Sequence, residues 1–171
     1  MYSDDKYVKE YLTNGKYPKI HDDIAVLIRE LPKDSVVLDV GCSTGLLTQR
    51  MLDMGLKCYG IDIDAEAVSK ANKYCKVMDI TDIASVEQYI IDNNINTAVC
   101  RRVLPEIMDA GVLFDFIDMM SRHIEYCVVE GRIESARSTH SLKNIDEEIK
   151  VLSKYYNPIK RYKRCAIMKI K

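Results

Sequence analysis

The sequence lacks any run of apolar residues approaching the ~20 that cross a bilayer. Its first ten residues, MYSDDKYVKE, carry acidic side chains where a secretory signal requires basic and apolar ones. Its six cysteines stand singly with no C-x-x-C pair, and its three histidines show no metal-ligand spacing. We therefore expect no membrane association, no metal, and a soluble protein in the reducing cytoplasm.

Internal repeats and low-complexity tracts are also absent. The chain has 171 residues, of which 47% are hydrophobic and 30% charged, enough for one globular core and too few for two. We expect a single domain over residues 1–171, with an N-terminal helical cap at 1–34 and an α/β core at 35–171.

The most informative segment is VVLDVGCSTGLLTQRM, from Val36 to Met51. An apolar run ends at a glycine-containing turn, and helical spacing follows, which predicts a strand, a turn and a helix. Glycines let the backbone approach a ligand closely, and the N–H groups that open the helix attract electron-rich groups. Neither the G-x-G-x-x-G fingerprint nor a Gly-Lys-Ser/Thr phosphate loop is present. Asp39 would repel a pyrophosphate and suits a ligand that carries an ammonium group.

At these residues the sequence resembles the class I S-adenosylmethionine-dependent methyltransferases, whose first motif reads hydrophobic-hydrophobic-D/E-x-G-x-G-x-G. This chain carries Ser43 in place of the middle glycine. The resemblance implies S-adenosylmethionine as cofactor and S-adenosylhomocysteine as product. It places Asp39, Gly41, Cys42, Ser43 and Gly45 at the cofactor.

Acidic residues follow the next two predicted strands. Asp62 ends the run KCYGID and lies 21 residues beyond Gly41, the position at which dinucleotide-type folds carry the acid that binds the ribose hydroxyls. A carboxylate accepts two charge-assisted hydrogen bonds from a vicinal diol. We assign the adjacent Ile63 to the same site. Asp62 or Asp64 is alternatively the N-cap of the following helix, a role that we favour for Asp64.

Asp79 follows the third short strand. In the resembling family the acid at this place receives the adenine amino group, and the next backbone N–H, here that of Ile80, reaches the ring. The alternative is an ordinary turn acid. Three acids at the carboxyl ends of successive strands fit a ligand in the crevice outside those ends.

Strands and helices alternate along the chain. The pattern predicts strands at 36–40, 58–62, 75–78, 97–100 and 126–130, a closing pair at 159–162 and 165–170, and helices at 5–12, 19–31, 46–54, 65–74, 83–92, 109–122 and 145–155. Such alternation implies a doubly wound Rossmann-like α/β domain with a mostly parallel sheet and helices on both faces. The resemblance adds that the sheet has seven strands and that the last is antiparallel. We trust the final strand more than the length of its partner, because the connecting turn is very tight.

Candidate catalytic residues follow the later strands. The segment CRRVLPEI lacks the D/N-P-P-Y/F signature of enzymes that methylate base amino groups, and it resembles the small-molecule branch. Glu106 and His140 are the candidate proton acceptors, Glu106 being alternatively a solvated loop acid. Arg101 and Arg102 are candidates for binding the cofactor carboxylate or an anionic substrate group. Their alternative is a salt bridge with Glu106 or Asp109.

The charge of the chain is uneven, because residues 1–99 carry a net −5 and residues 100–171 a net +4. From Lys154 onward there are seven cations and no acid. A nucleic-acid or phosphorylated substrate would account for this basic segment. Lysines that protect an edge strand from aggregation also account for it, and we prefer that interpretation.

The sequence thus predicts methyl transfer from S-adenosylmethionine to a small or medium-sized acceptor, at oxygen or nitrogen. One alternative is a nucleic-acid methyltransferase. The other is a non-catalytic module that binds S-adenosylmethionine as a regulator or partner subunit. Four N-terminal tyrosines are expected either to shape a lid over the cofactor or to pack a helix onto the sheet; they are Tyr2, Tyr7, Tyr11 and Tyr17.

Overall fold

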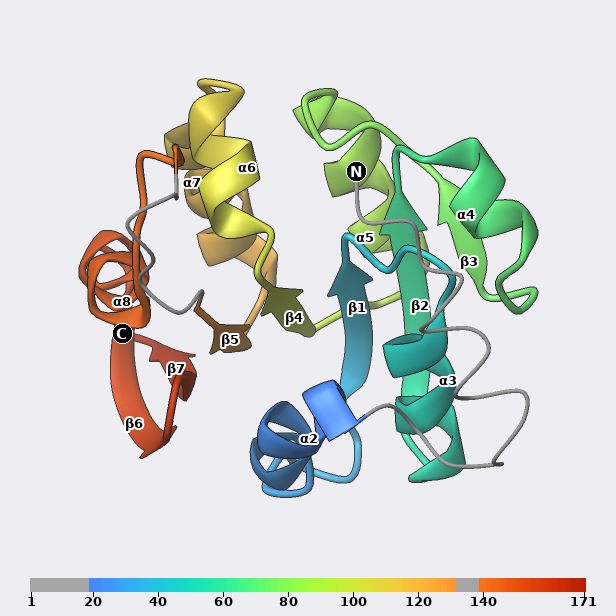
Figure 1. The fold of residues 1–171 in the computed structure, drawn as a ribbon, viewed down its shortest axis with the longest axis horizontal. Helices are drawn as coiled ribbons and strands as arrows, with labels where there is room; N and C mark the ends of the chain where they lie inside the picture. The colour runs from blue at the N-terminus through green and yellow to red at the C-terminus, as the bar shows by residue number, and fades with distance from the viewer. Residues whose placement is uncertain (1–18, 132–138) are drawn as a thin grey trace.

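A computed structural model describes residues 19–131 and 139–171 of the chain (Figure 1). Its strands are β1 (Val36–Val40), β2 (Lys57–Asp62), β3 (Cys75–Val77), β4 (Thr97–Arg101), β5 (Tyr126–Glu130), β6 (Tyr156–Tyr162) and β7 (Cys165–Ile170). They form one seven-stranded sheet in the order β3-β2-β1-β4-β5-β7-β6. The pairs among β1 to β5 are parallel, and β7 runs antiparallel to both β5 and β6. The predicted doubly wound α/β class is confirmed.

Helices cover both faces of the sheet. They are the 3-10 turn η1 (Lys19–His21), α2 (Asp22–Ile28), α3 (Leu46–Asp53), α4 (Ala65–Ser69), α5 (Ile83–Asp92), α6 (Leu104–Asp109), α7 (Leu113–His123) and α8 (Ile145–Leu152). Helices α2 and α3 supply the buried residues of one face, and α5, α6, α7 and α8 those of the other (Figure 1). The predicted helix at 5–12 and the N-terminal tyrosines lie outside the described residues.

The period-2 alternation of β1 divides the core into two layers. Leu38 and Val40 pack in the larger cluster, under α5 and α7. Val37 packs in the smaller cluster, under α2 and α3. Asp39 lies between Leu38 and Val40 in the strand, so its side chain emerges on the α2/α3 face, where a carboxylate needs a partner.

The helix predicted at 109–122 is wrong at its start. Two helices occupy this region, and the first, α6, begins at Leu104, five residues before the predicted start. Pro105 sits in the first turn of α6, where its missing N–H costs no hydrogen bond. Gly111 ends that helix with a φ of 80°, a conformation that glycine adopts without strain.

Other predicted boundaries also require correction. The helices predicted at 19–31 and 145–155 end at Ile28 and Leu152, and the first of them begins with a 3-10 turn. The helix predicted at 65–74 ends at Ser69, because Asn72 then forms a turn by accepting a hydrogen bond from the Tyr74 N–H. Strand β6 starts three residues earlier than predicted, at Tyr156, and contains Pro158. Proline is tolerated there because β6 is an edge strand with a register shift between Pro158 and Lys160.

Candidate active site

The loop after β1 has the backbone that its glycines predict. Gly41, Ser43 and Gly45 have φ values of 74°, 50° and 72°. The N–H groups of Gly41 and Cys42 donate to the carbonyl of Ile61, at 2.9 and 3.0 Å, which fixes the loop against the end of β2. Gly41 is exposed to solvent, and a Cβ there would lie 3.0 Å from Cγ2 of Val103. A ligand can therefore reach the backbone at Gly41, whereas a side chain would be strained.

Gly45 has a packing role that the motif did not reveal. It is the left-handed N-cap of α3, and a Cβ there would lie 2.9 Å from both the Ala71 Cβ and the Cys75 Sγ. Gly60, in β2, was not singled out from the sequence, although a Cβ on it would lie 2.8 Å from the Cys42 Sγ. A glycine inside a strand is the signal that would have found it. The two glycines bring β2, β3 and the loop close together.

Cys42 is buried beneath the loop. A hydrogen bond with the Cys75 thiol, together with burial, raises the Cys42 pKa far above its ordinary value. Its side chain is therefore an unreactive thiol, and Cys42 contributes to the loop through its backbone.

Asp62 joins the glycine loop to β2. Its Oδ2 accepts the Ser43 N–H at 2.8 Å, and its Oδ1 accepts the Asp64 N–H at 2.9 Å. An ionised carboxylate offers about four acceptor positions, so each oxygen retains one that suits a hydroxyl of a vicinal diol. The neighbouring Ile63 is 66% exposed and offers an apolar surface to a planar ring. These features fit an adenosine group.

Asp64 caps α4, as the sequence favoured. Its carboxylate accepts hydrogen bonds from the N–H groups of Glu66 and Ala67. Asp79 forms a turn in which its Oδ1 accepts both the N–H and the hydroxyl of Thr81, each at 2.8 Å. The turn role considered for Asp79 is therefore present, and Oδ2 is not part of those two bonds. Ile80 follows with a half-buried side chain.

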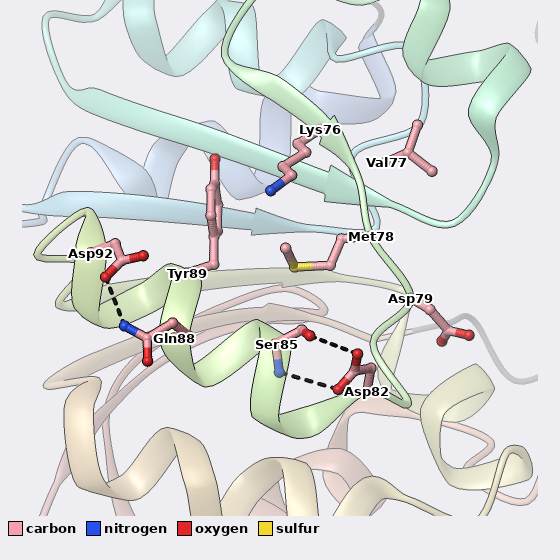
Figure 2. Close-up of a pocket in the computed structure, with 9 residues that line it drawn as sticks. All are labelled: Lys76, Val77, Met78, Asp79, Asp82, Ser85, Gln88, Tyr89 and Asp92. Carbon is pink, nitrogen blue, oxygen red and sulfur yellow. Dashed lines mark hydrogen bonds between the residues drawn. The ribbon is translucent and has the colours of Figure 1, made fainter.

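A groove of about 410 Å³ lies between β3 and α5 (Figure 2). Its lining consists of Lys76, Val77, Met78, Asp79, Asp82, Ser85, Gln88, Tyr89 and Asp92. Asp79 lies at one end of the groove (Figure 2). Of the residues that line the groove, Asp79 is the one that was also predicted to bind the cofactor. The glycine loop and Asp62 do not line it, so the groove lies beside the predicted cofactor site and does not define it.

Asp39 is buried, with 2% of its surface exposed, and its Oδ2 accepts the Thr48 hydroxyl at 2.7 Å. This bond ties β1 to α3. Burial raises the pKa of Asp39 to about 6, although the Thr48 hydrogen bond and the charge of Arg101 oppose that rise. The predicted contact with a ligand ammonium stays a prediction, since the observed partner of the carboxylate is Thr48.

Arg101 and Arg102 both pair with Glu130, at the end of β5, with Nε–Oε distances of 3.3 and 3.1 Å. The partners expected from the sequence, Glu106 and Asp109, are wrong because β4 and β5 are parallel and their register places Arg101 directly beside Glu130. Arg164, in the turn between β6 and β7, lies 3.1 Å from the same carboxylate. We call Arg101, Arg102 and Arg164 the arginine cluster. The Glu130 side chain at its centre is fully buried.

The two candidate proton acceptors lie near α6. The Nδ1 of His140 is 2.6 Å from Oδ2 of Asp109, the last residue of α6, and Oδ1 of Asp109 accepts the Ser141 N–H at 3.0 Å. Hydrogen bonds from Ser141, and then from His140, lower the Asp109 pKa. Glu106 is exposed and lies three residues before Asp109, on the same side of the helix. Sequence reasoning found His140 but not its pairing with Asp109.

Ion pairs engage most of the basic C-terminal segment. They are Lys160–Glu30, Arg161–Asp146, Lys163–Asp23, Arg164–Glu130 and Lys169–Glu125. Three of these cations lie on or next to β6, the edge strand of the sheet. Acids from elsewhere in the chain thus offset charge that a polyanion would otherwise meet.

Over residues 19–131 and 139–171, no group of three or more His, Cys, Asp or Glu side chains could hold a metal ion. Within the same ranges, no helix has the length and apolar character needed to cross a membrane.

The seven-stranded sheet and the glycine loop define a class I S-adenosylmethionine-dependent methyltransferase domain. The family model described as "Methyltransferase domain" matches residues 11–153, and the chain belongs to this family. The cofactor of this class is S-adenosylmethionine, and two of the structural neighbours contain S-adenosylhomocysteine.

Two solved structures illustrate the likeness of fold. The N-methyltransferase NodS from Bradyrhizobium japonicum WM9, in complex with S-adenosylhomocysteine, is 17% identical with a TM-score of 0.70, and the match covers 89% of this chain and 86% of that one. Magnesium protoporphyrin IX methyltransferase from Synechocystis PCC 6803 is 13% identical with a TM-score of 0.65, over 97% and 94% of the two chains. At these identities the likeness shows the fold alone.

The curated relatives include the ribosomal protein L11 methyltransferase of Lachnospira eligens. It is 28% identical over an alignment of 129 positions, and the match covers 67% of this chain and 41% of that protein. The corresponding protein of Clostridium botulinum (strain Eklund 17B / Type B) is 24% identical over an alignment of 135 positions, and the match covers 64% of this chain and 43% of that protein. This chain therefore spans about two fifths of the length of the relatives it matches.

Proposed function

We propose that this protein transfers the methyl group of S-adenosylmethionine to oxygen or nitrogen of a small or medium-sized acceptor. The observation that carries the proposal is the geometry of Asp62, which fastens the glycine loop at Ser43 and retains acceptor positions for a ribose diol. The exposed Ile63 beside it supports placement of the adenine there. The proposed cofactor residues are Asp39, Gly41, Cys42, Ser43, Gly45, Asp62, Ile63, Asp79 and Ile80. Arg101 borders this set and is the candidate for either the cofactor carboxylate or an anionic group of the acceptor.

We assign the proton acceptor to His140. In the tautomer in which Nδ1–H of His140 donates to the Asp109 carboxylate, Nε2 carries the lone pair that can accept a proton. The acceptor's lone pair forms a bond to the methyl carbon as the carbon–sulfur bond breaks, and the acceptor's proton passes to Nε2. S-adenosylmethionine supplies an already activated methyl group, so proximity and orientation account for most of the protein's contribution. Glu106, exposed on α6, is the second candidate.

The test measures consumption of methyl-labelled S-adenosylmethionine by the full chain in the presence of metabolite, RNA and ribosomal-protein pools. We expect label in the metabolite pool. His140→Gln is expected to lower kcat by about 10²-fold while affinity for S-adenosylhomocysteine stays unchanged. Glu106→Gln is the matched control, and an effect on that variant alone would reassign the proton acceptor.

The other acceptors are outcomes of the same assay. The names of the curated relatives make a protein acceptor the second candidate, to which labelled ribosomal protein would point. The ion pairs of Lys160, Arg161 and Lys163 weigh against a nucleic-acid acceptor. S-adenosylhomocysteine binding without consumption of the methyl donor would indicate the non-catalytic module.

We also infer a reducing compartment, the cytoplasm. All six cysteines are free thiols, and five of them are buried. An oxidising compartment favours disulfides in a chain with this many cysteines.

A further inference from the structure

Among residues 19–131 and 139–171, the arginine cluster carries more positive charge than the carboxylate at its centre. Three guanidinium groups pair with Glu130, and these four side chains together carry a net charge of +2. The charge of Arg101 also acts on Asp39. When an ionised Asp39 is counted with Glu130 and the arginine cluster, the net charge is still +1. Two other acids nearby, Asp22 and Asp23, pair with Arg50 and Lys163. Excess charge that is partly withdrawn from water is costly unless a counter-charge is supplied.

The cluster also contains hydrogen-bond donors that remain unsatisfied. Nε and Nη2 of Arg101 and Nε of Arg164 are buried, and none makes a hydrogen bond within the part of the chain that the structure describes. The two Nε atoms lie in ion-pair range of Glu130, at 3.3 Å for Arg101 and 3.1 Å for Arg164. Buried donors are normally satisfied, and a guanidinium presents its donors as a fork that matches two oxygens of an oxyanion.

The pKa of His21, at the start of α2, responds to the charges of this cluster. Only 3% of its surface is exposed, and burial followed by the charges of Arg101, Arg50 and Arg102 lowers its pKa to about 3. The imidazole is therefore neutral at ordinary pH and adds no further positive charge. Burial is the larger cause of this shift, and the three arginine charges add to it, which shows that positive charge acts on this part of the structure.

The cluster borders the loop proposed to hold the cofactor. Arg101 ends β4, and Val103 lies two residues beyond it, with Cγ2 at 3.0 Å from the position of a Cβ on Gly41. Arg164 approaches from the hairpin turn, where its carbonyl accepts the Gly131 N–H at 2.9 Å. The carboxyl ends of β4 and β5 thus present the cluster next to the proposed methyl donor.

We propose that the arginine cluster binds an anionic group, a carboxylate or a phosphate, carried by the methyl acceptor. The inference rests on the proposed function, because that function is what makes the bound molecule a methyl acceptor. The same chemistry has a second source, the methionine carboxylate of the cofactor, so the test must separate the two.

The test titrates inorganic phosphate into the full chain at constant ionic strength, with and without saturating S-adenosylhomocysteine, and follows binding by calorimetry. We expect the same phosphate affinity in both cases. Arg164→Gln is expected to weaken it about tenfold, the effect of losing one charge-assisted hydrogen bond. Lys160→Gln removes one positive charge from an exposed pair with Glu30 and is expected to change nothing. If Arg164→Gln does not fold, Arg164→Lys retains the charge and is expected to lose part of the affinity.

The source of the anion is tested with 5′-methylthioadenosine, which lacks the carboxylate of S-adenosylhomocysteine. If Arg164→Gln weakens S-adenosylhomocysteine but not methylthioadenosine, and phosphate competes with the former, the cluster holds the cofactor and the acceptor assignment is overturned. Absence of phosphate binding beside normal S-adenosylhomocysteine binding overturns the anion site alone. Failure of the parent to bind S-adenosylhomocysteine overturns the proposed function and, with it, the acceptor assignment.

Discussion

The burial of Asp39 predicts a pH dependence of stability that one substitution should remove. Its pKa in the folded protein is about 6, against an ordinary value of 3.8. Because the folded value is raised, the contribution to stability is fully present below pH 3.8 and is lost as the pH rises through 6. Linkage gives about 2 kcal/mol lost between pH 4 and pH 8.

Asp39→Asn keeps an acceptor for Thr48 and removes the titration. The free energy of unfolding of the variant minus that of the parent is expected to be about 2 kcal/mol larger at pH 8 than at pH 4, because only the parent loses stability over this range. Urea unfolding followed by far-ultraviolet circular dichroism is the suitable assay, because the chain has no tryptophan. Asp34→Asn, the same chemical change at an exposed position, is the control. Parallel pH profiles for the parent and Asp39→Asn would refute the reasoning.

Three further predictions concern other parts of the structure. The pKa of His21 is lowered to about 3 in the folded protein, so its contribution to stability is complete above pH 6.5 and is lost as the pH falls. The parent should therefore lose about 2 kcal/mol of unfolding free energy between pH 8 and pH 5 through this residue. His21→Gln should abolish that loss, as measured by urea unfolding. Gly41→Val should abolish S-adenosylhomocysteine binding in calorimetry, because φ is 74° and a Cβ would lie 3.0 Å from Val103. Replacing Lys160, Arg161 and Lys163 by glutamine should leave cofactor affinity unchanged and increase aggregation measured by light scattering, since these cations protect the edge strand.

Each of these predictions has a contrary result. A His21→Gln profile parallel to the parent's between pH 5 and pH 8 would show that the ring does not titrate as described. Equal titration curves for Gly41→Val and the parent would remove the loop from the cofactor site. Salt-sensitive RNA binding by the parent that the triple variant loses would favour a nucleic-acid acceptor, because counterion release makes such binding fall with salt.

Local patterns were sufficient to predict the parallel strands, whereas the seven-strand sheet and its antiparallel last strand were implied by the family resemblance. Apolar runs predicted β1 and β5 to the residue, and helical periodicity did the same for α5. Helix α6 was missed because its six residues are too few to show periodicity, and its proline is as common in loops as in first turns. The extent of β6 was missed because Pro158 is unusual in strands and is tolerated here at the edge of the sheet.

The candidate site divides in the same way. The glycine loop and Asp62 were predictable because their spacing is local to one strand–turn–helix unit and the next strand. The Arg101–Glu130 and His140–Asp109 pairs join residues about thirty positions apart, and only the register of β4 with β5 and the path of the chain after β5 bring them together. No periodicity encodes such partners.

The central claim is tested most directly by calorimetric titration of the full chain with S-adenosylhomocysteine, in the parent and in Asp62→Asn. The account predicts saturable binding by the parent and an affinity about tenfold or more lower in the variant, because the ribose hydroxyls lose a charged acceptor and the loop loses its tie at Ser43. Binding of NADH in place of S-adenosylhomocysteine, or equal affinities for the parent and Asp62→Asn, would contradict it.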